Sequence, residues 1–215
     1  EPLFVFVVMV MAASRPIVAT VQALLAWIAQ RVPVATPLAL SWLGLAVVPL
    51  MGSLITEPAA MTIAALSLAA LVFTPRMPTR LKYLALGILF VNISIGGTLT
   101  SYAAPPVLMV ATAWGWDSAF MLQNFGWKAA VAVIINASIA AWAMRHHLQQ
   151  PAAESSANTA AMPWTVVLVH IALLAAVVLL AHHPVLFLGI FLLFLGYTHA
   201  YAQHQSPLIL KEALL

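Results

Sequence analysis

Long apolar runs separated by short polar breaks dominate this chain. Several runs approach the roughly 20 apolar residues that a helix needs to cross a bilayer. The stretch 16–31 instead mixes a few polar side chains with apolar ones, which is typical of a helix lying in the membrane interface. The apolar pattern predicts membrane helices over residues 3–13, 37–50, 59–73, 83–116, 126–144, 164–181 and 185–202. We therefore predict an all-α integral membrane protein, a multi-spanning helical bundle.

Composition supports this class and excludes others. The chain is 64% hydrophobic and only 6% charged, whereas a soluble domain carries about a quarter charged residues. The net charge of +3 forms no basic patch interleaved with aromatic residues, so a nucleic acid partner is not expected. Cysteine is absent, which excludes disulfides and thiolate metal ligands.

We expect one membrane domain over residues 1–215: helices and breaks in 1–144, a hydrophilic loop in 145–163 and further crossings in 164–215. The chain opens on Glu1 without a methionine and stops within an apolar pattern. We interpret it as an internal fragment of a longer polypeptide, with a processed mature chain as the alternative.

The polar break at residues 52–58 allows two interpretations of the apolar runs around it. They form either one long broken crossing or a re-entrant hairpin whose tip is the break. The hairpin places seven of the eight Lys and Arg residues on one side and leaves only Lys128 on the other, a bias that marks the cytoplasmic side. The bias therefore favours the hairpin, with loops 74–82 and 145–163 in the cytoplasm.

Glu57 is a lone carboxylate between two apolar runs. An ionised carboxylate at membrane depth is costly unless it is paired, hydrated or given a cation. The alternative is an ordinary helix start, with Thr56 as N-cap, Glu57 near the positive helix end and Pro58 in the first turn. We favour a direct role in binding an ion or proton, with Ser53 and Thr56 adding the neutral oxygens that hard cations prefer.

The run 83–116 is too long for one simple crossing and is interrupted twice, at residues 94–100 and at Pro105-Pro106. A helix that is broken by paired glycines and restarted by prolines is typical of transporters, where the break exposes backbone carbonyls and amides. The alternative is close helix packing by small residues. We predict a discontinuous helix lining an ion site that includes these residues: Asn92, Ser94, Gly96, Gly97, Thr98 and Thr100.

The other polar residues are weaker candidates for an ion site. Asn136 is expected to form an interhelical hydrogen bond, and His170 to be a satisfied polar residue rather than a proton relay. The remaining histidines lack the i, i+3 or i, i+4 spacing of a metal site, so no metal is expected beyond Na⁺ at Glu57. No cofactor motif and no nucleophile–base arrangement is visible, which argues against an enzyme.

Two motifs resemble those of the ion transporter superfamily, specifically its bacterial sodium/proton antiporters. They are Gly-Ser-Leu-Ile-Thr-Glu-Pro-Ala-Ala-Met-Thr at residues 52–62 and Asn-Ile-Ser-Ile-Gly-Gly-Thr-Leu-Thr-Ser-Tyr-Ala-Ala-Pro-Pro at residues 92–106. The order of spanning helix, interfacial helix, hairpin and broken helix also resembles that superfamily. The resemblance covers roughly residues 3–144 and implies a bacterial inner-membrane protein in the lipid bilayer, with a homodimer as one possible assembly.

The chain departs from the superfamily pattern in three places. Residues 53–57 replace the Ser-Asn-Thr tip of the dicarboxylate carriers, and Val107 replaces the asparagine of a Pro-Pro-Asn ending. The superfamily folds use two inverted repeats, whereas this chain contains one hairpin-plus-broken-helix unit. We therefore expect the other half of the site to lie outside this sequence.

The predicted function is secondary active transport that exchanges Na⁺ for H⁺, with both ions competing for Glu57. The alternative is a sodium-coupled carrier of a dicarboxylate or other anion, against which the fixed charge of Glu57 argues. A membrane scaffold is a third class, but it would not need two glycine-containing breaks around an acid.

Overall fold

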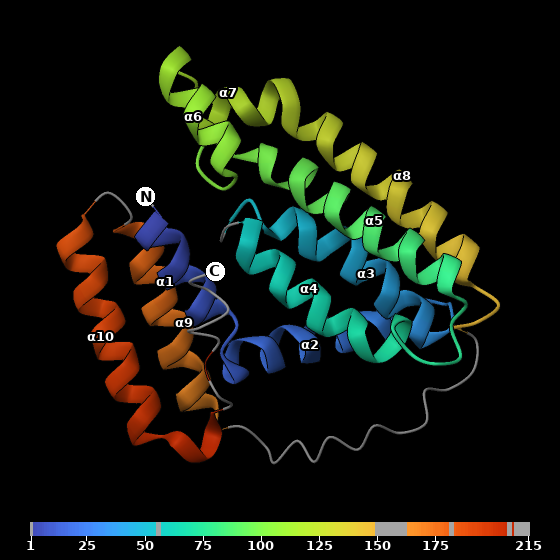
Figure 1. Ribbon diagram of the computed structural model, residues 1–215, viewed down its shortest axis with the longest axis horizontal. Helices are drawn as coiled ribbons and strands as arrows, with labels where there is room; N and C mark the ends of the chain where they lie inside the picture. Colours follow the sequence, from blue (N-terminus) through green and yellow to red (C-terminus); the bar gives the residue numbers. More distant parts are fainter. Residues whose placement is uncertain (1, 55–56, 149–162, 181–182, 206–207, 209–215) are drawn as a thin grey trace. The chain divides into compact units, whose positions relative to one another are not determined.

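A computed structural model of the chain describes residues 2–54, 57–148, 163–180, 183–205 and 208 (Figure 1). All regular elements in these ranges are helical, as predicted. The contacts divide the chain into two compact units. One unit is Leu24–Ser155, and the other combines Glu1–Ala23 with Ser156–Leu215. The two polar breaks both belong to the first of these units.

Helix α3 (Thr36–Met51) is the centre of the unit Leu24–Ser155. It packs against α4 (Glu57–Val72), α5 (Thr79–Gly96) and α8 (Trp127–Met144). Figure 1 shows α4 and α5 next to it. A helix with neighbours on several sides must be apolar around most of its circumference. Accordingly, α3 buries nearly every residue of its second half, from Leu43 to Pro49.

Small residues allow the helices of this unit to approach closely. The buried face of α5 carries Ala85, Leu89, Asn92 and Gly96, spaced three or four residues apart as one helical face requires. The facing stripe of α8 is mostly alanine, and small residues are what bring helix backbones together in membranes.

The discontinuous helix is present, but its break lies later than predicted. Helix α5 continues through Gly96, and Gly97–Leu99 (η1) tightens into a 3₁₀ turn. Extended backbone begins only at Thr100 (φ −123°, ψ 161°), and the chain restarts as a helix at α6 (Pro105–Trp114) with both prolines in its first turn. The prediction that the paired glycines themselves are unwound is therefore wrong, whereas the predicted restart at the prolines is confirmed.

The next helix begins earlier than its apolar run suggested. Asp117 caps α7 (Ser118–Met121) by accepting a hydrogen bond from the backbone N–H of Phe120 at 2.7 Å. A π-helical turn, η2 (Leu122–Gly126), then joins α7 to α8, so that helical structure runs unbroken from Ser118 to Met144. The π turn packs against η1, where Gly126 lies next to Leu99.

The other unit contains α1 (Pro2–Ala12), α9 (Trp164–Leu179), α10 (Pro184–Ala200) and the short η3 (Ala202–His204). Helix α1 contacts both α9 and α10, and edge-on aromatic pairs such as Phe6–Phe191 join it to α10. Helix α2 (Arg15–Ala29) follows α1 after a bend of 60°. This bend agrees with the predicted end of the first apolar run at residue 13.

The helices have the exposed apolar faces of a membrane protein. Thr79–Leu99 and Ser118–Met144 are long and apolar enough to span a bilayer, and the bent pair of α1 and α2 would make a third span. The exposed stripe of α8 begins at Trp127 and ends at Trp142, and a cation lies over each ring. Aromatic and cationic residues at both ends of an apolar stripe are typical of the two membrane interfaces.

Candidate functional site: the hairpin tip and the broken helix

The hairpin formed by α3 and α4 meets the broken helix at a buried asparagine. Pro49 has no backbone N–H, so the carbonyl of Leu45 loses the donor that a regular helix would supply. The side chain of Asn92 replaces this donor, since its Nδ2 lies 2.7 Å from the Leu45 oxygen. The same nitrogen also donates to the Val133 carbonyl of α8 at 3.3 Å. Asn92 therefore joins α3, α5 and α8.

Asn136 completes this arrangement. Its Nδ2 donates to Oδ1 of Asn92 at 3.0 Å, which confirms the predicted interhelical hydrogen bond. Asn92 is fully buried, and both ends of its amide have partners. A buried polar group with every bond made rigidifies its surroundings. We call Asn92, Asn136 and the Leu45 carbonyl the asparagine clamp.

Gly96 lies one helical turn after the clamp, directly against α3. A Cβ at this position would lie 2.4 Å from the Pro49 carbonyl oxygen and 2.7 Å from its carbonyl carbon. Both atoms belong to the backbone, so no side-chain rotation could relieve the contact. Gly97 has a similar role, since a Cβ there would lie 2.9 Å from that of Ala104. The paired glycines therefore allow close approach rather than unusual backbone angles.

Ser53 joins the hairpin tip to the break through two hydrogen bonds, as donor in one and as acceptor in the other. Its hydroxyl donates to the carbonyl of Gly96, and its own carbonyl accepts a hydrogen bond from the hydroxyl of Thr100 at 2.8 Å. Ser53 is almost fully buried. The two polar breaks thus meet through hydrogen bonds between residues more than forty positions apart.

Glu57 begins α4 beside the same break. Its backbone N–H donates to the carbonyl of Ala103 at 3.1 Å, so the end of the break helps to satisfy the start of the helix. Its carboxylate accepts a hydrogen bond from the hydroxyl of Ser94 at 2.9 Å. Glu57 is half-buried and Ser94 is exposed. In the described part of the chain, Ser94 is the one hydrogen-bond donor to this carboxylate.

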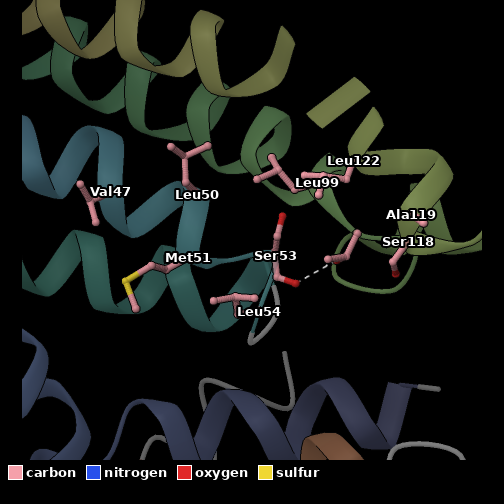
Figure 2. A pocket seen from close by; sticks show the side chains of 10 residues that line it. Val47, Leu50, Met51, Ser53, Leu54, Leu99, Ser118, Ala119 and Leu122 are labelled. Carbon is pink, nitrogen blue, oxygen red and sulfur yellow. Dashed lines mark hydrogen bonds between the residues drawn. The ribbon is translucent and has the colours of Figure 1, made fainter. Parts of the chain in front are cut away.

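A surface pocket of about 540 Å³ opens where the tip and the break meet. Figure 2 shows Ser53 within its lining, between Leu54 and Leu99, with Ser118 and Ala119 beyond. The walls are mostly apolar, and three residues contribute hydroxyl groups: Ser53, Thr100 and Ser118. Neither Glu57 nor Ser94 belongs to this lining.

The structure thus separates the predicted site residues into groups. Glu57 and Ser94 form one pair, Ser53 and Thr100 the tip-to-break bonds, and Asn92 the clamp. Thr98 bonds locally, donating to the Ile95 carbonyl at 2.7 Å. Thr56 lies outside the described residues.

Sequence reasoning missed the contributions of Pro49 and Ser118. A proline within an apolar helix frees a carbonyl four residues earlier, which was the available signal for Pro49. Ser118 shares a hydrogen bond with the Ser101 hydroxyl at 3.0 Å, and no local pattern marked it.

Other titratable residues form no second candidate. Both ring nitrogens of the buried His170 have partners, the Val166 carbonyl and the Gln205 amide, each at 2.8 Å. This agrees with the prediction of a satisfied polar histidine. Among the described residues, no group of three or more His, Asp or Glu side chains could hold a metal ion.

Comparisons with known proteins agree with the predicted family. No curated protein and no solved structure matched this chain. One family profile, described as "Putative Na+/H+ antiporter", matches residues 1–215, the whole of the sequence. The chain therefore belongs to the Na+/H+ antiporter family that this description names.

Proposed function

We propose that this protein exchanges Na⁺ for H⁺ across a membrane and that Glu57 binds the two ions in alternation. The observation that carries the proposal is the placement of Glu57: a half-buried carboxylate at a helix start, held against the broken helix, with one hydroxyl as its partner. A carboxylate with unused acceptor positions at such a place is suited to a cation or a proton.

Competition at one carboxylate would couple the two fluxes. A protonated Glu57 has lost the charge that attracts Na⁺, and a sodium-bound Glu57 has no free charge for a proton. The hydroxyl of Ser94 can donate to the empty carboxylate and can turn a lone pair toward a bound cation. Exchange then requires that the site open to the two sides of the membrane in turn, and that each ion be released on the side where the other binds.

The remaining predicted residues would support Glu57 and Ser94, which bind the ion directly. Ser53 and Thr100 hold the tip against the break and line the neighbouring pocket, which is a route by which water or Na⁺ could approach. The asparagine clamp would keep α3, α5 and α8 together while the tip moves. Thr56, Gly96, Gly97 and Thr98 remain proposed parts of the site because they lie in the same two breaks.

The hairpin is proposed to be re-entrant. Helices α3 and α4 have 16 residues each, which is about 24 Å of helix against a hydrocarbon core of about 30 Å. The Lys and Arg bias favours loops 74–82 and 145–163 in the cytoplasm of a bacterium, with the protein in its inner membrane. A second, inverted hairpin-plus-broken-helix unit and a homodimer complete the proposal by analogy with the superfamily.

Vesicle transport assays test this function directly. Purified protein is reconstituted in vesicles that contain a pH-sensitive dye, and Na⁺ is added outside. We expect Glu57→Gln to abolish sodium-dependent proton flux, because an amide can neither release a proton nor attract a cation. Asp117→Asn is the matched control, since Asp117 is an exposed helix cap outside the site, and it should retain flux.

Unchanged flux in Glu57→Gln would exclude the proposed role of this carboxylate. Uptake of a labelled dicarboxylate driven by Na⁺, without proton flux, would instead support the sodium-coupled anion carrier. The family match names Na⁺ and H⁺ and does not favour that alternative. It also indicates a transporter rather than an enzyme.

A further inference from the structure

A second pocket, of about 550 Å³, lies between the broken helix and the α7–η2–α8 segment. It is open to the surface, and its volume falls within the range of small-molecule sites. Pro106, Val107 and Val110 of α6 line it, and Ala129 and Ala132 of α8 contribute only methyl groups. It shares no lining residue with the pocket at Ser53.

The walls of this pocket are apolar and partly aromatic. Trp116 and Phe125 line it, and their rings pack with centroids 5.5 Å apart. Aliphatic residues of α5 and α6 form the opposite side. Thr98 contributes a hydroxyl, but its hydrogen is already donated to the Ile95 carbonyl. The apolar lining therefore suits a hydrocarbon chain better than a hydrated ion.

Lys128 gives the pocket its charge. Lys128 is the one charged side chain in the lining, and it is exposed with its ammonium 5.6 Å from the centre of the Trp127 ring. The charge is positive, so a complementary occupant carries a negative group next to an apolar tail.

The position of Lys128 along α8 indicates where that negative group lies. Trp127 and Trp142 end the exposed apolar stripe of this helix, so Lys128 is at the level of a membrane interface. It is also the one Lys or Arg that the charge bias places on the non-cytoplasmic side. From Lys128 the lining continues to Ala129 and Ala132, toward the middle of α8, which suits a lipid with its phosphate at Lys128 and its chain in the bilayer.

We propose that this pocket binds one acyl chain of an anionic phospholipid, whose headgroup phosphate pairs with Lys128. The bound chain lies against Ile95 and Thr98, on the same discontinuous helix that carries Ser94 and Gly96. Lipid binding is independent of the identity of the transported ions.

Tryptophan quenching tests the proposal. The whole protein is reconstituted with phosphatidylglycerol whose acyl chains are brominated, or with phosphatidylcholine carrying the same chains. The contribution of Trp116 is the difference between wild type and Trp116→Phe. We expect phosphatidylglycerol to quench it at about five-fold lower mole fraction than phosphatidylcholine, as one interfacial cation provides.

Two variants test the headgroup pairing and the pocket separately, and a third serves as control. Lys128→Gln should remove the preference for phosphatidylglycerol, and Ala132→Phe should fill the pocket and protect Trp116 from both lipids. Arg145→Gln is the matched control, because Arg145 lies over Trp142 at the other end of α8, away from the pocket, and it should keep the preference.

Equal quenching by the two lipids in wild type, or a preference that survives Lys128→Gln, would overturn the proposal. The same holds if Trp116 is not quenched at all, which would indicate that another protein segment or a second copy fills the pocket. Circular dichroism verifies that each variant folds. If Ala132→Phe does not, the surface substitution Lys128→Gln still decides the outcome.

Discussion

Two polar pairs on α5 and its neighbours, Asn92–Asn136 and Glu57–Ser94, differ in how completely they are satisfied. Asn92 is fully buried, donates to two backbone carbonyls and accepts from Asn136. The Glu57 carboxylate is half-buried, and the Ser94 hydroxyl is its one donor in the described part of the chain. A carboxylate can accept about four hydrogen bonds, so the described residues fill only part of its capacity.

This difference in hydrogen bonding suggests a structural role for the Asn92–Asn136 pair and an ion-binding role for the Glu57–Ser94 pair. A buried neutral amide with both donors used and one bond accepted is a weaker ligand for a cation than a carboxylate with one donor among the described residues. Substitutions at the clamp should therefore reduce stability first, and substitutions at the carboxylate pair should alter ion binding while leaving stability nearly unchanged.

Gly96→Ala should have the largest effect on stability. The new methyl group would overlap the Pro49 backbone, so α3 and α5 would have to separate. We expect a loss of about 3 kcal/mol in the free energy of unfolding, measured by SDS titration in mixed micelles. Gly87→Ala on the same helix is the matched control, since a Cβ there meets nothing within 4 Å. Equal stability of the two variants would contradict the close approach.

Asn92→Leu should have the next largest effect. It keeps the branched shape of the side chain but leaves the Leu45 carbonyl and the Asn136 amide without their partner. Hydrogen bonds between membrane helices contribute modestly, so we expect a loss of about 1–2 kcal/mol in the same titration. A variant as stable as wild type would mean that the clamp does not hold the helices together.

Pro49→Ala sharpens the interpretation of that loss. An alanine N–H can donate to the Leu45 carbonyl, so that carbonyl no longer depends on Asn92. Asn92→Leu should therefore cost less in the Pro49→Ala background, by about 0.5–1 kcal/mol in a double-mutant cycle. Strictly additive effects would show that the proline and the asparagine are not coupled.

Ser94→Ala should have the smallest effect on stability and a visible effect on ion binding. Ser94 is exposed, so we expect the free energy of unfolding to change by less than about 0.5 kcal/mol. The apparent affinity for Na⁺ should fall a few-fold, because one neutral oxygen ligand is lost; it can be measured from sodium-induced thermal stabilisation. A large loss of stability without a change in affinity would assign Ser94 to the scaffold instead.

Local pattern was sufficient to predict α3 and α4 but not their contacts. The apolar runs predicted α3 and α4 to within about two residues at each end, because apolar length and flanking polar residues are local properties. The restart of the broken helix was equally predictable, since prolines favour the first turn.

The paired glycines show what local pattern omits. Gly96 and Gly97 suggested unwound backbone, yet both have right-handed helical angles, and their lack of a side chain serves contacts with Pro49 and Ala104. Such contacts depend on segments distant in sequence. The same limit applies to Asn92, since its hydrogen-bond partners on α3 and α8 are not visible in the local pattern that places it among the proposed ion ligands.

The dependence of sodium affinity on pH tests the central claim most directly. The apparent Kd for Na⁺ is measured by calorimetry on the purified protein over a series of pH values, for wild type and for Glu57→Gln. Competition at one carboxylate predicts that the wild-type Kd rises toward acid pH, by about tenfold per pH unit at the acid limit, and that Glu57→Gln shows no sodium binding. A wild-type Kd that is independent of pH, or a Glu57→Gln variant that binds Na⁺ as wild type does, would contradict the account.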